Sequence, residues 1–169
     1  MPIQRLNHAV LYVRNVERST AFYTDVLGFR PVVRFPGAAF LQAEDSTNDH
    51  DLGLFEMGDR AAASPAGRAS VGLYHLAWEV DTLAELKRIE ARLRQAHALV
   101  GASNHQTTKA LYAHDPDGLE FEVAWLVPIQ YLTPELKVAD PRAQKLDIDG
   151  EIARYGATTV GGIGVSVKA

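Results

Sequence analysis

Apolar and polar residues alternate along a series of short segments, and two longer segments carry apolar residues at helical spacing. A period of two predicts strands, and a period near 3.6 predicts helices. The expected helices span 16–27, ending at Gly28, which favours a helix stop, and 82–97. The expected strands are 5–13, 29–35, 38–43, 52–57, 72–80, 98–102, 109–113 and 119–126.

The order of these elements repeats along the chain. Residues 5–13 (RLNHAVLYV) and 72–80 (GLYHLAWEV) are similar strands that carry a histidine at the same point, His8 and His75. Each strand is followed by one helix and three further strands, so the chain reads βαβββ twice. The sequence therefore predicts an α+β fold built from two βαβββ modules.

The modules are expected at residues 3–57 and 72–127, and together they would form one domain. The connector 58–71 is rich in alanine, glycine and proline, which is typical of an exposed linker. A C-terminal extension, 128–169, matches neither module, and we expect a short helix around 143–155 within it.

Strand alternation places the two histidines on the more polar face of their strands. The opposite, apolar faces should pack on the helices and are formed by Ala9, Leu11 and Val13, and by Leu76, Trp78 and Val80. We expect the two sheets to form an open, cupped barrel, with His8 and His75 pointing into its concavity. Their convergence requires that a pseudo-twofold axis relates the halves.

Composition excludes several classes of site. The 169 residues include no cysteine, which removes disulfides, thiolate nucleophiles and zinc–sulfur sites. A net charge of −4 without a basic patch argues against nucleic acid or an anionic membrane as partner. No apolar run approaches the roughly 20 residues of a membrane span, and the N-terminal residues lack the apolar stretch of a signal peptide. We expect a cytoplasmic protein.

A third candidate metal ligand lies in the last predicted strand, four positions after the glycine of the turn Asp115–Gly118. Two imidazoles, from His8 and His75, and one carboxylate, from Glu122, are the ligand set of mononuclear non-haem iron(II) sites, and manganese(II) would fit the same atoms. Such a set leaves open positions for a chelating substrate and dioxygen. Glu120 is on the same strand face and is the alternative carboxylate.

This repeat, with its two histidines and the DPDG turn before Glu122, resembles the vicinal oxygen chelate superfamily. That group includes glyoxalase I, fosfomycin and bleomycin resistance proteins and extradiol ring-cleaving dioxygenases. The resemblance covers about residues 3–127. It implies that His8, His75 and Glu122 bind the metal.

Residues outside this triad resemble those of single-domain extradiol dioxygenases of the catechol 2,3-type. The stretch DHDLGLF at 49–55 matches a segment of these enzymes whose histidine, here His50, is the acid/base group. Tyr112, ten residues before Glu122, matches their active-site tyrosine, and His105 is similar to a second pocket histidine. The resemblance implies iron(II)-dependent cleavage of a catechol-type aromatic diol by dioxygen, with the pocket completed by the extension or by a second copy of the chain.

Two alternatives stay open. Glyoxalase I is similar in layout but adds a carboxylate ligand from the last strand of its first module, where this chain has Gly53 or Leu54. A shift of two residues would instead bring Glu56 to the metal. Replacement of Glu122 by Asp51, Glu120 or Glu56 in the metal shell would change both the expected metal and the expected reaction. The other alternative is a small-molecule-binding resistance protein without catalysis, against which the complete triad argues.

Overall fold

A computed structural model describes residues 2–3, 5–66, 69–133 and 144–162 of the chain. The chain divides into two compact units, Met1–Pro65 with Asp115–Gly118, and Ala66–His114 with Leu119–Ala169. Each unit combines a mixed sheet with helices, which confirms the predicted α+β fold with two βαβββ-type modules. Among the described residues, no helix is long and apolar enough to cross a membrane.

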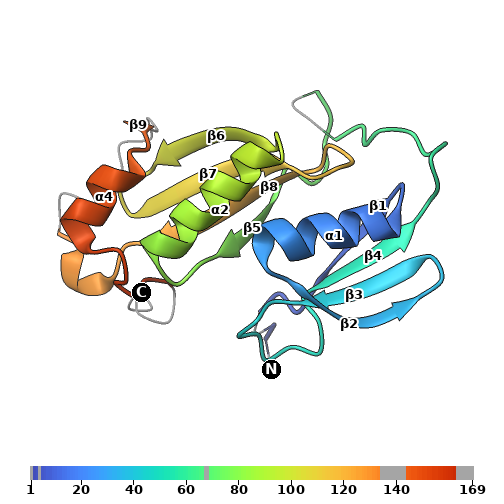
Figure 1. Ribbon diagram of the computed structural model, residues 1–169, viewed down its shortest axis with the longest axis horizontal. Helices are drawn as coiled ribbons and strands as arrows, with labels where there is room; N and C mark the ends of the chain where they lie inside the picture. The colour runs from blue at the N-terminus through green and yellow to red at the C-terminus, as the bar shows by residue number, and fades with distance from the viewer. Residues whose placement is uncertain (1, 4, 67–68, 134–143, 163–169) are drawn as a thin grey trace. The chain divides into compact units, whose positions relative to one another are not determined.

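The first unit contains one helix on a four-stranded sheet (Figure 1). In the sheet order β1-β4-β3-β2, β1 pairs with β4 in parallel, and the other neighbours are antiparallel. The helix packs on the face of the sheet that carries the buried leucines and valines. The elements are β1 (Ala9–Val13), α1 (Val16–Leu27), β2 (Arg30–Phe35), β3 (Ala38–Gln42) and β4 (Leu52–Glu56).

Local sequence fixes both ends of α1. The side chain of Asn15 accepts a hydrogen bond from the backbone N–H of Arg18 and caps the N-terminus. Gly28 ends the helix in the left-handed conformation, with φ of 80°. Val16, Tyr23 and other residues of one face are buried against the sheet. The predicted helix over 16–27 is therefore present with the same bounds.

The second unit repeats this plan and extends it (Figure 1). Its sheet has the order β5-β8-β7-β6-β9, with β5 and β8 parallel. The short strand β9 and helix α4 come from the C-terminal extension. The elements are β5 (Leu76–Glu79), α2 (Leu83–Gln95), β6 (Leu99–Asn104), β7 (Thr108–His114), β8 (Glu120–Leu126), a 3-10 turn (Ile129–Tyr131), β9 (Gln144–Lys145) and α4 (Ile148–Tyr155).

Three predicted elements are shorter in the structure. Pairing of β1 with β4 begins at Ala9 and pairing of β5 with β8 begins at Leu76, so His8 and His75 directly precede their strands. Helix α4 begins at Ile148 rather than near 143, because Asp147 caps it by accepting from the N–H of Gly150 at 3.1 Å. Residue 143 lies outside the described residues.

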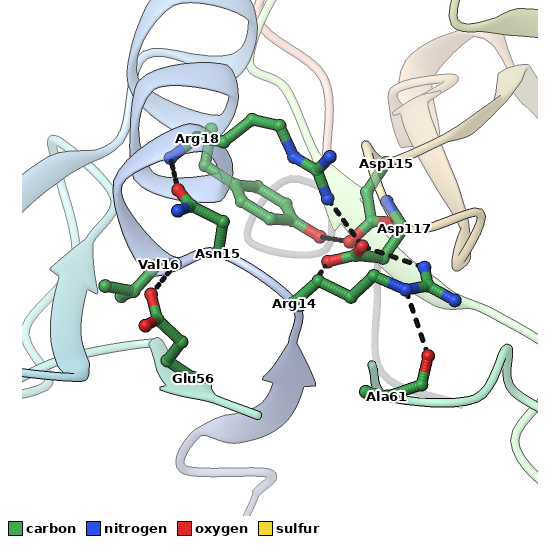
Figure 2. Close-up of polar contacts among 9 residues, drawn as sticks. Arg14, Asn15, Val16, Arg18, Glu56, Ala61, Asp115 and Asp117 are labelled. Carbon is green, nitrogen blue, oxygen red and sulfur yellow. Dashed lines mark hydrogen bonds and ion pairs between the residues drawn. The ribbon is translucent and has the colours of Figure 1, made fainter. Parts of the chain in front are cut away.

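The Asp115–Gly118 turn contacts the residues that begin α1 (Figure 2). The Asp117 carboxylate accepts from the backbone N–H of Arg14 at 2.9 Å, from its guanidinium at 3.1 Å, and from Arg18 at 2.6 Å. Its side chain is only 7% exposed, so these bonds are largely shielded from water. Arg14 also donates from Nε to the carbonyl of Ala61 at 3.1 Å.

We expect Asp117→Ala to lower the free energy of unfolding by about 2–3 kcal/mol, since it leaves two guanidinium groups and a backbone N–H without their acceptor. Circular dichroism during urea unfolding measures this change. In the control Arg34→Ala, which removes only the exposed Arg34–Glu17 pair, the change should stay within about 0.5 kcal/mol. Equal losses in both variants would contradict this assignment.

Candidate active site

In the first unit, two histidines that are far apart in sequence lie side by side. The rings of His8 and His50 have centroids 4.6 Å apart, and the ring of Phe40 lies with its edge toward His50 at 4.8 Å. Parallel pairing of β1 with β4 explains this, because Ala9 is in register with Leu52 and the two histidines precede these strands. Phe40 was not singled out by the sequence, where it reads as an ordinary strand residue.

A hydrogen bond sets the tautomer of His8. Its Nδ1 lies 2.7 Å from the side-chain carbonyl oxygen of Asn7. A carbonyl oxygen only accepts hydrogen bonds, so this contact places the proton on Nδ1 and leaves the lone pair on Nε2. Histidines that bind metals are held in this way, with one nitrogen donating to a neighbouring oxygen and the other facing the metal.

Asp51 organises the loop that carries His50. Its carboxylate accepts from the N–H of Ala43 at 2.8 Å, and from the side chains of Ser46 and Asn48, both at 2.7 Å. These bonds use both carboxylate oxygens. Asp51 therefore has a structural role as the acceptor that closes this loop, and the adjacent His50 is held in place by it.

The second unit brings together His75 and Glu122, which are 47 positions apart. Nε2 of His75 lies 3.2 Å from Oε2 of Glu122, and both side chains are mostly shielded from water. Two ligands with metal bonds of about 2.1 Å at a right angle have donor atoms about 3 Å apart. This pair therefore fits one edge of an octahedral site. Among the described residues, Nδ1 of His75 is buried without a hydrogen-bond partner.

Tyr112 and His105 lie next to this pair. The Tyr112 hydroxyl is 3.0 Å from Nε2 of His105, and its ring centroid is 5.9 Å from that of His75. Tyr112 is directly opposite Glu122 in the β7–β8 pairing, so the two side chains share a face. The pKa of Tyr112 is raised to about 12, mainly by burial and next by the negative charge of Glu122. At neutral pH the hydroxyl therefore keeps its proton and can donate a hydrogen bond.

The other carboxylates considered from the sequence have different neighbours. Glu120 faces His114, with 3.7 Å between Oε2 and Nε2. Glu56 accepts from the backbone N–H of Val16 at 2.9 Å, at the N-terminus of α1 (Figure 2). Glu56 is in register with Val13, whose side chain is buried on the helix side of the sheet. It therefore points to the face opposite the one that carries Val10.

Gly53 occupies the face that Glu56 does not. It is in register with Val10 and on the same side of the sheet. A Cβ atom at Gly53 would lie 3.3 Å from the Phe40 ring and 3.4 Å from Val10. The position thus holds no carboxylate, and the missing side chain makes room for the aromatic ring beside His50.

The described residues contain no group of three or more histidine or carboxylate side chains gathered around one point. His8 and His50 belong to the first unit, whereas His75, Glu122, Tyr112 and His105 belong to the second. Each unit by itself presents part of the predicted ligand set, with donor types suited to iron(II) or manganese(II). The assignment of the whole triad stays a prediction.

Comparison with known proteins decides the family. The sequence pattern of the Glyoxalase/Bleomycin resistance protein/Dioxygenase superfamily matches residues 5–123. The chain belongs to this superfamily. A domain of the superfamily from Frankia sp. EAN1pec has the same fold, with a TM-score of 0.59 and 23% identity over 73% of this chain and 92% of that one.

Two curated relatives have different activities. The chain is 33% identical over 118 residues to a catechol-2,3-dioxygenase of Bacillus subtilis (strain 168), and the match covers 70% of this chain but 40% of that protein. It is 31% identical over 126 residues to a lactoylglutathione lyase of Neisseria meningitidis serogroup A, covering 70% of this chain and 88% of the lyase. The chain thus spans less than half of the dioxygenase that it matches.

We expect a tyrosine that titrates near pH 12 in the metal-free protein and is absent from Tyr112→Phe. Because the folded pKa is raised from 10, Tyr112 stabilises the fold fully below pH 10, and this contribution is lost as the pH rises through 12. The ultraviolet difference titration of the two proteins isolates this residue. In Glu122→Gln the pKa should fall toward its ordinary value. A transition near pH 10 in the unmodified protein would contradict the assignment.

Proposed function

We propose that the protein is an iron(II)-dependent extradiol dioxygenase that cleaves a catechol-type aromatic diol with dioxygen. The observation that carries this proposal is the arrangement of the second unit, where Tyr112 and His105 lie beside the His75–Glu122 pair. The position of His50 next to His8 supports it, since an acid/base histidine belongs beside a metal ligand in this reaction. The similarity to a catechol-2,3-dioxygenase adds weight.

In this proposal His8, His75 and Glu122 hold the metal. Iron(II), when bound there, supplies Lewis acidity toward the diol oxygens and the redox capacity that dioxygen chemistry requires. Manganese(II) would satisfy the same ligands. His8 is prepared for this role by its Nδ1 contact with Asn7, which leaves Nε2 able to bind.

The remaining residues act on protons. Tyr112 keeps its hydroxyl proton at neutral pH and can donate a hydrogen bond to one diol oxygen, which orients the ring and favours loss of the diol proton. His50, beside His8, is the acid/base group of this proposal: its imidazole can take a proton and return it as the oxygen–oxygen bond breaks. The carbon–carbon bond beside the diol breaks, and both atoms of dioxygen enter the ring-opened product.

A glyoxalase-I-like lyase is the second candidate, because the Neisseria lyase match covers 88% of that enzyme. Its chemistry needs a fourth, carboxylate ligand from the last strand of the first module. In this chain Glu56 points to the helix side and caps α1, and Gly53 has no side chain to offer. These two observations favour the dioxygenase.

The direct test is anaerobic loading with iron(II), followed by a catechol and air, with oxygen uptake and product absorbance recorded. We expect stoichiometric uptake with a yellow product. His8→Ala should lose the metal, whereas His50→Ala should keep it and lose about 10²- to 10⁴-fold in turnover. Metal binding without uptake across several catechols would overturn the proposal, and hemithioacetals with nickel or zinc would then be assayed.

Glu56→Ala separates the two candidate ligand sets. If Glu56 only caps α1, this variant should keep the full iron stoichiometry and lose about 1 kcal/mol in the free energy of unfolding. Glu122→Ala is the matched variant that should lose the metal. Metal analysis and urea unfolding measure the two effects. Loss of metal in Glu56→Ala would instead indicate the four-ligand set of a glyoxalase.

A further inference from the structure

A lysine is buried inside the second unit. The Lys109 side chain is 1% exposed and lies on the helix side of β7, the face opposite Tyr112. Its ammonium contacts three oxygens, namely the side chain of Asn104 at 2.8 Å, the carbonyl of Gln106 at 3.0 Å and Glu151 Oε2 at 3.2 Å. The first two contacts are hydrogen bonds, and the third is an ion pair that balances the buried charge of the ammonium.

The acidic partner comes from the C-terminal extension. Glu151 lies in the first turn of α4, and its second oxygen accepts from the side-chain amide of Asn104 at 2.9 Å. Lys109, Asn104 and Glu151 therefore form a closed network that joins β6, β7 and α4. We call these three residues the Lys109 network.

The Lys109 network holds the turn that carries His105. This turn connects β6 to β7, and Gln106 within it is in the left-handed conformation with φ of 68°, which a residue with a side chain seldom adopts. Both backbone groups of Gln106 are bonded to the network, the N–H to Asn104 at 2.8 Å and the carbonyl to Lys109. His105, directly before it, reaches Tyr112 on the other face of the sheet.

We propose that the Lys109 network positions His105 for its contact with Tyr112. Through Glu151, the C-terminal extension thereby takes part in arranging the active site. The inference rests on the proposed function, since it gives His105 a substrate-contacting role. Lys109, Asn104 and Glu151 are positioning residues, because they act only through the turn.

Stability alone does not account for the Lys109 network. Burial lowers the pKa of the Lys109 ammonium from its ordinary value, against the opposing influence of Glu151. Apolar side chains of similar size in place of a buried ion pair are often neutral or stabilising. What apolar residues could not do is donate to the Gln106 carbonyl, as Lys109 does, or hold the Asn104 side chain that accepts from the Gln106 N–H. The retained function of the pair is therefore to fix the turn.

The test is the double variant Lys109→Met/Glu151→Leu, which replaces the ion pair by apolar residues of similar size. We expect it to fold and to bind iron(II) as the unmodified protein does. Hydrogen exchange of the Gln106 amide should become faster, the imidazole resonances of His105 should shift, and KM for the catechol should rise about three- to tenfold. The matched control is Lys87→Met/Asp149→Leu, which removes the exposed pair between α2 and α4 and should leave all three unchanged.

Measurements on the metal-free protein distinguish failure of the positioning role from failure of the proposed function. If Gln106 amide exchange and the His105 resonances of the double variant match those of the control variant, the positioning role is overturned, whatever the activity. If the unmodified protein cleaves no catechol, the proposed function fails, but altered exchange and resonances would still establish the structural coupling. Should the double variant not fold, Glu151→Gln takes its place, and unchanged Gln106 exchange in that variant would equally overturn the proposal.

Discussion

Parallel pairing between the first and last strands of each module determines which of the candidate site residues become neighbours. β1 beside β4 brings His8 next to His50, and β5 beside β8 brings His75 next to Glu122. In both modules the helix and two further strands lie between the paired segments in sequence. A functional side chain at the start of a module thus meets one near its end, and neither would have this neighbour in an antiparallel hairpin arrangement.

Local signals were sufficient for most elements of the fold. α1 has its predicted bounds because an asparagine cap and a left-handed glycine lie at its two ends. The strands that follow His8 and His75 were predicted to begin too early, because a strand begins where its partner allows pairing, and the partner is distant in sequence. The same holds for β9, a two-residue strand defined only by its pairing with β6.

The candidate site was predictable to the extent that it depends on strand faces. His75, Glu122 and Tyr112 lie together as alternation implies. Alternation also places Glu56 and Gly53 on opposite faces of the strand, because a step of three positions reverses the face. The sequence alone therefore argues against Glu56 as a metal ligand of the glyoxalase type. The burial of Lys109 had no local signal, because its partner is 42 positions away in the extension.

Gly53 also links its own position in β4 to the surroundings of His50. A glutamate there would bring its first side-chain carbon to within 3.3 Å of Phe40. The ring would have to move by a few tenths of an ångström to make room for it. Because the Phe40 ring also lies against His50, a side chain added at position 53 would be felt at that histidine through the ring.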